Sequence, residues 1–347
     1  MMRGSSKVAN VSGKSSGAPR RLGSQQPAPS KSPKASASSG AQRRQARARK
    51  GSSSKRMGWI AVALVVVVIG ALIIVKVTSS TSSTPTADPA GRTPLPAPAA
   101  MVLPVTGVPS SVFDSIGVNG QAAMFVVTKN QPSLSQAGKP RFIYVGGEYC
   151  PYCAAMRWSL VAALSRFGTF KNLKESASGP SDGDIPTFSF LGASYSSPYV
   201  QFTPYEQTDR LGALLTPVPA DVQKLYTTYD GTQSRSTIFS SGGAGIPFLD
   251  IANRYVSAGD PPYLSSFFNN DTGPLVNGGP GAIAIAQSVN NPNSVIGKAI
   301  GASGFIVAAN YIAAAVCNVD GQMPSAVCTS KAVTAAKGVL AKATPIG

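Results

Sequence analysis

An uncharged run of nineteen residues, 57–75, divides this chain into two parts of different character. At about 1.5 Å of rise per residue, a helix of that length nearly crosses a hydrocarbon core of about 30 Å. Trp59 lies near one end of the run, and Arg56 and Lys76 flank it. The run predicts one transmembrane helix over residues 57–77, and any globular domain has to lie on one side of it.

The segment before this run is strongly basic. Residues 1–57 contain 14 Lys or Arg and no Asp or Glu, whereas the remaining 290 residues contain 17 basic and 14 acidic residues. With few large apolar side chains, residues 1–56 are expected to be a disordered tail. Basic flanks stay on the cytoplasmic side, so the tail indicates topology and contact with membrane lipid. Nucleic-acid binding ranks last among its interpretations, because the topology already explains its charge.

The expected membrane helix is interpreted as an uncleaved signal anchor. The charged region before it is far longer than that of a signal peptide, and no small-x-small cleavage site closely follows it. The protein is then a single-pass protein of the cell membrane with an extracytoplasmic C-terminal domain. Residues 78–107, rich in Ser, Thr, Pro and Ala, are predicted to form an extended linker. The folded domain is expected to span residues 108–342, which is long enough for one sizeable core.

Strand and helix patterns alternate within this domain, which favours an α/β fold. Strands are expected at 123–127, 141–147, 186–192, 199–204 and from 245, and helices at 110–117, 154–167, 219–229, 281–289 and 294–317. The uncharged stretch 299–317 also raises a second membrane span. Ile300, Val307 and Tyr311 recur there at helical spacing among small residues, which favours a helix buried in a soluble core.

Cys150 and Cys153 stand in the stretch "GGEYCPYCAAMRW", and three interpretations compete for them. A zinc site needs further Cys or His ligands, but the chain has no His, and Cys317 and Cys328 lack paired-ligand spacing. A covalent haem site needs His after the second Cys, where Ala154 stands. A purely structural disulfide would close a very small ring and add little stability. A redox pair is favoured, with no metal and no bound cofactor.

The position of the pair supports redox chemistry. Cys150 follows a β-rich run and precedes an amphipathic helix, where free backbone N–H groups and the helix dipole favour a thiolate. Cys150 is expected to be exposed and to attack, and Cys153, one turn further in, to be buried and to resolve the mixed disulfide. Tyr152 between them carries no cation. Glu148 should oppose ionisation of the thiols, and Arg157 on the helix should compensate.

Four stretches carry a family resemblance. They are "FIYVGGEYCPYCAAMRW…LSRFG", "PTFSFLGASYSSPYVQF", "GIPFLDIANRY" and "AANYIAAAVCNVDGQMPSAVC". Over roughly residues 105–335 the chain resembles the domain-of-unknown-function 929 family. The resemblance implies a thioredoxin-like fold, with Cys150 as nucleophile, Cys153 as resolving thiol and Pro247 as the cis-proline that faces the pair. About 94 residues separate Cys153 from Pro247, which predicts a helical insertion.

The expected function is that of a membrane-anchored thiol–disulfide oxidoreductase outside the cytoplasm. Its partners would be envelope proteins that carry thiols or disulfides, together with a protein that recycles the pair. The alternative is a thioredoxin-like module for binding or assembly in the cell envelope whose pair does not turn over. Redox exchange with a dithiol distinguishes the two.

Cys317 and Cys328 flank the turn-rich segment "NVDGQMPSAV" after a long apolar helix. We expect a structural disulfide between them, since exported proteins keep such bonds. Two free buried thiols are the alternative.

Overall fold

The computed structural model describes residue 91 and residues 93–230, 245–259, 264, 279–343 and 345. The chain divides into two units, 1–82 and 83–347, and the described residues all lie in the second. The expected tail at 1–56, the membrane helix at 57–77 and most of the linker therefore lie outside the described residues. The described unit has a mixed α/β architecture with several sheets.

The main sheet is built around one central strand, β4 (Lys139–Gly146). Strand β9 (Gln201–Glu206) pairs with β4 in parallel, and β10 (Phe248–Ile251) pairs with its other edge antiparallel. The sheet continues through β11 (Tyr255–Ala258) to β2 (Val126–Val127), and β3 (Ser135–Gln136) forms a short hairpin with β4. Because β9 runs parallel to β4, a crossover must join them, and α4 (Pro151–Leu164) begins that crossover.

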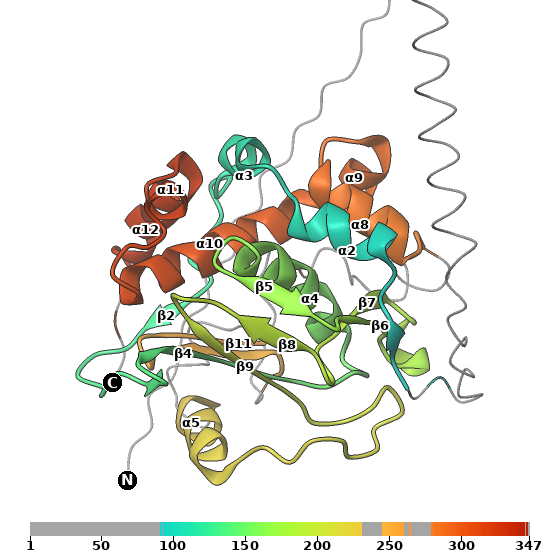
Figure 1. Cartoon of the computed structure of the whole chain (residues 1–347), viewed down its shortest axis with the longest axis horizontal. Coiled ribbons are helices and arrows are strands. Elements are labelled where there is room, and N and C mark those ends of the chain that lie inside the picture. Colours follow the sequence, from blue (N-terminus) through green and yellow to red (C-terminus); the bar gives the residue numbers. More distant parts are fainter. Residues whose placement is uncertain are drawn as a thin grey trace, which may run out of the picture. The chain divides into compact units, whose positions relative to one another are not determined.

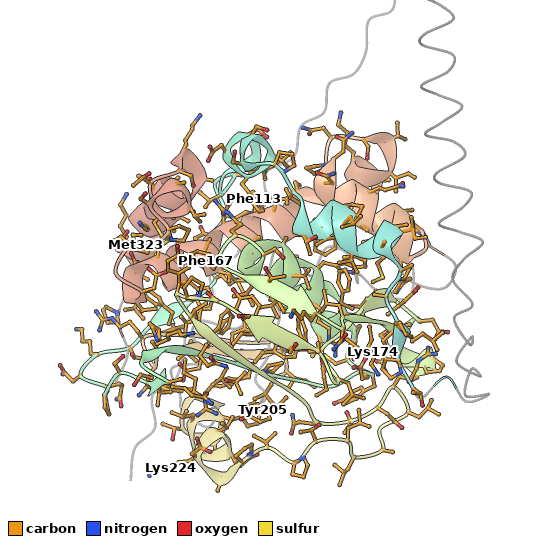
Figure 2. All side chains as sticks on the ribbon, in the orientation of Figure 1. Phe113, Phe167, Lys174, Tyr205, Lys224 and Met323 are labelled. Atoms are coloured by element: carbon orange, nitrogen blue, oxygen red, sulfur yellow. A yellow bond between two sulfur atoms is a disulfide. The ribbon has the colours of Figure 1, made fainter. Side chains whose placement is uncertain are left out.

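Helices cover both faces of this sheet (Figure 1). One face packs against α4 and α10 (Ser303–Val319), and the other against α5 (Ala220–Asp230). Figure 2 shows this separation, with Phe113 and Phe167 among the larger group of helices and Lys224 on α5. The larger group also contains α2, α3, α8, α9, α11 and α12 (Ala99–Thr106, Ser110–Ile116, Ala282–Asn290, Val295–Ala299, Ser325–Cys328, Lys331–Leu340).

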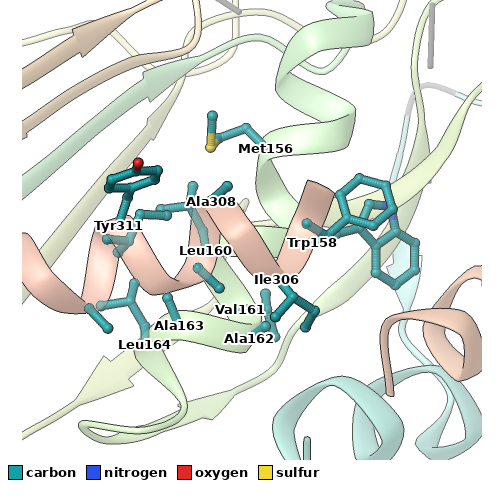
Figure 3. Close-up of a cluster of buried hydrophobic side chains, with 14 of the residues drawn as sticks. Met156, Trp158, Leu160, Val161, Ala162, Ala163, Leu164, Ile306, Ala308 and Tyr311 are labelled. Carbon is teal, nitrogen blue, oxygen red and sulfur yellow. The ribbon is translucent and has the colours of Figure 1, made fainter. Parts of the chain in front are cut away.

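Close contact between α4 and α10 forms the centre of the core (Figure 3). Small residues such as Ala162, Ala163 and Ala308 let the two helices approach, and Leu160 and Tyr311 fill the space around them. All residues of α10 from Gly304 to Cys317 are buried, as the core-helix interpretation of 299–317 expected. The expected single helix over 294–317 is wrong, because Ile300–Ala302 separate α9 from α10.

Membrane-spanning length is not reached by any single helix in the described part of the chain. There, the apolar helices α2 and α3 satisfy the length and composition criteria only as a pair, which is bent by 64°.

The expected linker boundary at residue 107 is wrong. Strand β1 (Leu95–Pro96) pairs with β6 (Lys174–Ala177), and α2 begins directly after Pro98. Met101 and Val105, four residues apart, are both fully buried. The Pro- and Ala-rich composition concealed a helix whose apolar side chains lie one turn apart on the same face.

Between Cys153 and Pro247 the described residues contain one further helix, α5, but the segment before β9, where the helical insertion was expected, is mostly β-strand. After α4 come four short strands and a 3₁₀ turn before β9: β5, β6, η1, β7 and β8 (Thr169–Lys171, Lys174–Ala177, Pro180–Asp182, Pro186–Ser189, Ser194–Ser196). Strands β6 and β7 form an antiparallel hairpin beside α4, and β5 pairs with β8. These strands are three or four residues long, too short for a clear periodicity of two.

Candidate functional site

Cys150 lies at the junction between the central strand and the helix that follows it. Strand β4 ends at Gly146, and α4 begins at Pro151 with Cys150 as its N-cap. The Cys153 N–H donates to the Cys150 sulfur at 3.1 Å, which supplies one of the partners that the first turn of a helix lacks. Pro151 has no N–H to satisfy, so it suits the first helical position.

Two glycines let the chain turn closely at this junction. A side chain at Gly146 would overlap the hydroxyl of Tyr144, and a Cβ at Gly147 would lie 2.7 Å from the Thr208 hydroxyl oxygen. The Glu148 N–H donates to the Thr208 carbonyl at 2.9 Å. The loop after β9 therefore packs directly against the residues that precede the cysteines.

The segment that contains Pro247 contacts the cysteine pair, although it lies far along the chain. The peptide bond between Ile246 and Pro247 is cis, and β10 begins at the next residue. The Cys150 thiol lies 3.6 Å from the Ile246 carbonyl oxygen, to which it donates. The structure thus brings together the three residues that the sequence selected, Cys150, Cys153 and Pro247.

Both cysteines of the pair are free thiols and both are buried. Cys153 is fully buried, as expected, but Cys150 is only 3% exposed, so the expectation of an exposed Cys150 is wrong. The Ile246 carbonyl lies against its sulfur, which the local sequence around the pair does not reveal. The neighbouring Tyr149 and Tyr152 are 38% and 41% exposed, so the chain on either side of Cys150 lies at the protein surface.

Burial raises the pKa of the Cys153 thiol well above its ordinary value. The adjacent Cys150 acts in the same direction, while the charge of Arg157 and the Gly147 backbone partly oppose the increase in pKa. Cys153 is therefore a protonated thiol at neutral pH until its surroundings change.

A buried ion pair lies one turn along α4 from Cys153. Arg157 Nε and Nη2 donate to the two carboxylate oxygens of Glu206 at 2.9 and 2.7 Å, and Nη2 also donates to the Gly147 carbonyl at 2.8 Å. Arg157 is fully buried and Glu206 is 2% exposed. Glu206 ends β9 directly opposite Gly146 of β4. This two-point contact ties the helix that carries the cysteines to both central strands.

Glu148 is a second buried carboxylate near the same arginine. It is fully buried, and the Ser189 hydroxyl donates to its Oε1 atom. Burial raises the pKa of Glu148 to about 7, and the negative charge of Glu206 adds to that increase, while Arg157 opposes it. Arg157 thus stabilises the negative charge of both Glu206 and Glu148, and Glu148 changes protonation state near neutral pH.

Glu148 and Arg157 could be recognised beside the cysteines from the sequence, but Glu206 could not. Only the pairing of β9 with β4 brings Glu206 to the cysteines, so no local pattern could have found it. Trp158 is fully buried in the core, and its indole N–H donates to the Pro186 carbonyl at 3.1 Å.

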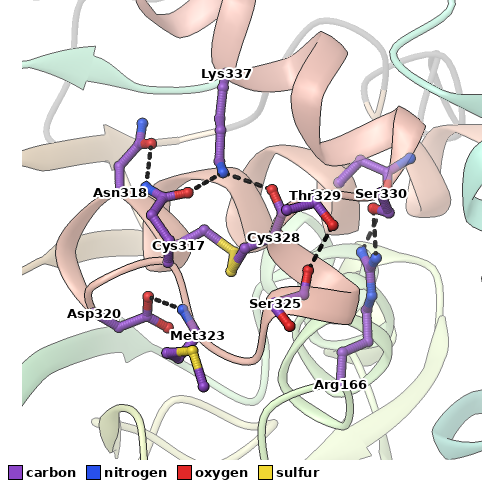
Figure 4. The surroundings of a disulfide bond; sticks show 12 residues. Arg166, Cys317, Asn318, Asp320, Met323, Ser325, Cys328, Thr329, Ser330 and Lys337 are labelled. Carbon is purple, nitrogen blue, oxygen red and sulfur yellow. Dashed lines mark hydrogen bonds between the residues drawn. A yellow bond between two sulfur atoms is a disulfide. The ribbon is translucent and has the colours of Figure 1, made fainter.

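The second cysteine pair has different surroundings (Figure 4). Cys317 near the end of α10 and Cys328 at the end of α11 form a disulfide, with Cα atoms 5.5 Å apart. Both are buried, and Lys337 donates to the Cys328 carbonyl at 2.6 Å. The bond closes the connection between two helices and leaves no thiol for exchange.

No group of three or more His, Cys, Asp or Glu side chains that could hold a metal ion occurs among the residues that the structure describes.

Comparison with protein families identifies the family of the chain. A family described as "Domain of unknown function (DUF929)" matches residues 125–314, which is more than half of the chain and includes the first cysteine pair and Pro247. No curated protein and no solved structure matches the chain.

Proposed function

Because the chain belongs to the DUF929 family, whose description assigns no activity, we propose its function from the site: a thiol–disulfide oxidoreductase with a thioredoxin-like fold. The observation that carries the proposal is the Cys150 sulfur, which caps a helix and contacts the residue before Pro247.

Strand order supports the thioredoxin-like assignment. Within the main sheet the strands lie in the order β11, β10, β4, β9. Strand β9 is parallel to β4, β10 is antiparallel to β4, and β11 is antiparallel to β10. A helix beginning with two cysteines follows the central strand, and a cis-proline precedes the antiparallel neighbour. Thioredoxin-like domains share this arrangement. Fold alone does not imply an activity, so the proposed activity is argued from the chemistry of the site.

The proposed reaction is a two-electron exchange between dithiols and disulfides. The Cys150 thiolate attacks one sulfur of a client disulfide, which forms a mixed disulfide and expels a client thiolate. Cys153 loses its proton and attacks the Cys150 sulfur, which releases the second client thiolate and leaves a Cys150–Cys153 disulfide. The client is reduced and the protein oxidised. The same steps in reverse oxidise a client dithiol, and a partner dithiol or disulfide restores the pair.

The difference between the two thiols supports these roles. Burial raises the pKa of Cys153 and keeps it protonated, so Cys153 is the poorer first nucleophile. Cys150 lies at the N-terminus of α4, where its sulfur accepts a hydrogen bond from the Cys153 N–H. A client reaches Cys150 only by replacing its contact with the Ile246 carbonyl, since the residue is 3% exposed.

The location is part of the proposal. The apolar run 57–75 is interpreted as a signal anchor that places the domain outside the cytoplasm. The Cys317–Cys328 disulfide agrees with an oxidising compartment. Clients and the recycling partner are then proteins of the cell envelope that carry thiols or disulfides.

Burial of Cys150 favours one alternative, a module for binding or assembly whose cysteines do not turn over. Exchange with a model dithiol separates the two functions, because an inert pair neither oxidises nor reduces it.

Variants of each cysteine test the proposal. Cys153→Ser should trap mixed disulfides with clients through Cys150, because the resolving thiol is absent. Cys150→Ser should trap few or none. Non-reducing electrophoresis of membrane extracts measures the trapped species. The oxidoreductase proposal fails if Cys153→Ser traps nothing and the intact protein exchanges with no model dithiol, and the binding module then replaces it.

A further inference from the structure

The hairpin formed by β6 and β7 presents hydroxyl groups to the candidate site. In its register Ser176 lies opposite Thr187, and Lys174 opposite Ser189. Because alternate residues of a strand share one face, Ser176, Thr187 and Ser189 lie on the same side of the hairpin. Thr187 and Ser189 are fully buried, although their hydroxyls are polar.

Each buried hydroxyl has a partner next to a cysteine. Thr187 donates to the Ala154 carbonyl at 2.7 Å, at the residue after Cys153. Ser189 donates to Glu148, two residues before Cys150. Ser176 also favours the charged form of Glu148, although Oε2 of that carboxylate has no partner within hydrogen-bond distance among the described residues. The hairpin therefore contacts the junction on both sides of the pair.

Glu148 is electrostatically linked to the thiols through a shared cation. Arg157 stabilises negative charge both on Glu148 and on Cys153. The titratable and charged groups around this centre come from β4, β9 and α4: Tyr144, Glu206, Cys150, Cys153 and Arg157. When Glu148 ionises, it competes with a thiolate for the same arginine, so its protonation state changes thiolate formation.

We propose that the β6–β7 hairpin, through Ser189 and Glu148, sets the pH range over which the Cys150–Cys153 thiols react. This inference rests on the proposed function only in taking that pair as the reactive one. Ser189 acts as a positioning residue: its hydroxyl fixes the Glu148 carboxylate and stabilises its charged form. The hairpin lies in the segment between α4 and β9, so a part of the chain without cysteines controls the chemistry of the pair.

The expected effect of Ser189 has a definite sign. A donated hydrogen bond stabilises a carboxylate, so its loss keeps Glu148 protonated to higher pH. Alkylation by iodoacetamide follows the thiolate fraction, and its dependence on pH should contain an inflection near pH 7 where Glu148 ionises. Ser189→Ala should move that inflection upward by about one pH unit. Glu148→Gln should remove it.

The experiment measures the alkylation rates of Cys150 and Cys153 in the reduced full-length protein between pH 5 and 9, with peptide mapping. Ser159→Ala is the matched control, since it removes a buried hydroxyl from α4 that has no hydrogen-bond partner among the described residues. Its profile should match that of the unmodified protein. Ser189→Thr, which keeps the hydroxyl, should restore the original inflection. If Ser189→Ala does not fold, Ser176→Ala should give a smaller upward shift.

Two results would overturn the inference. One is an inflection that stays in place in Ser189→Ala, or in Ser176→Ala where Ser189→Ala does not fold. The other is an inflection that survives in Glu148→Gln. Alkylation needs no turnover, so a protein that exchanges with no dithiol but shows the shifted inflection would refute the oxidoreductase proposal and leave this one standing.

Discussion

Cys150 and Cys153 begin a helix at the end of the central strand, whereas Cys317 and Cys328 join the end of one helix to another. Both pairs are buried, so exposure does not distinguish them. Around the first pair lie a buried arginine and two buried carboxylates. Around the second lie Lys337, which donates to the Cys328 carbonyl, and Arg166, which donates to Ser330, and neither forms a salt bridge with a carboxylate among the described residues. The chemistry expected of a cysteine thus follows from the charges and backbone beside it.

The ion pair behind the first cysteines gives the largest expected effect. Arg157→Met leaves the buried Glu206 carboxylate without its cation and should lower the free energy of unfolding by about 3 to 5 kcal/mol. Urea unfolding at pH 7 measures it.

Arg166 provides the comparison for that variant, because it lies beside the second pair (Figure 4). It donates to Ser330 at 3.3 Å and to Asn310 at 3.4 Å and lies 4.2 Å from the centre of the Phe113 ring, and among the described residues it has no carboxylate at salt-bridge distance. Arg166→Met should lower stability by only about 1 kcal/mol. Equal losses in the two variants would contradict the electrostatic distinction between the regions.

Removal of the second pair should have an intermediate effect on stability and none on exchange. Cys317→Ala with Cys328→Ala opens a short loop and should lower the free energy of unfolding by about 2 to 3 kcal/mol. Dithiol exchange should match that of the unmodified protein. A native protein in which either thiol is freely alkylated would refute the disulfide, and lost exchange in a folded variant would show that the regions are coupled.

At the first pair, stability should also depend on pH, with an effect smaller than those of removing the ion pair or the disulfide. The pKa of Glu148 is about 7 in the folded protein, above its usual 4.5, so the folded state binds more protons in this window and stability falls as pH rises through it. Glu148→Gln removes this contribution. Relative to the unmodified protein, it should gain on the order of 2 kcal/mol on going from pH 5 to pH 8.

Asp250, whose pKa burial also raises to about 7, keeps its contribution in both proteins, so the difference isolates Glu148. The stability lost in the Cys317→Ala, Cys328→Ala variant should be the same at pH 5 and pH 8, because loop closure does not titrate. A flat difference for Glu148→Gln would show that its carboxyl titrates normally.

Much of the site could be predicted from sequence because its key residues are marked locally. Cys150 precedes Pro151 after a β-rich run, and Pro247 stands directly before a strand. A Pro just inside a helix or directly before a strand indicates, from the local sequence alone, where that element begins. The buried helix α10 was likewise visible in the spacing of Val307 and Tyr311.

The remainder depends on contacts between distant residues. Glu206 acquires its role only when β9 pairs with β4, and Ser189 only when the β6–β7 hairpin packs beside α4. The burial of Cys150 depends on Ile246, far along the chain. Helix α2 was missed because Pro and Ala suggested a linker, and only its packing shows that Met101 and Val105 face the core.

The contact between Cys150 and Ile246 also has a consequence for the order of events during biosynthesis. The ribosome makes the first cysteine pair long before it makes Ile246, so both thiols emerge without the carbonyl that later covers Cys150. The ribosome adds about 5 to 20 residues per second, and a domain folds only as its residues become available. The nascent thiols are thus open to oxidants and to other cysteines for several seconds. The residues that form the second pair are only 11 positions apart in the sequence and can join almost as soon as both have been made.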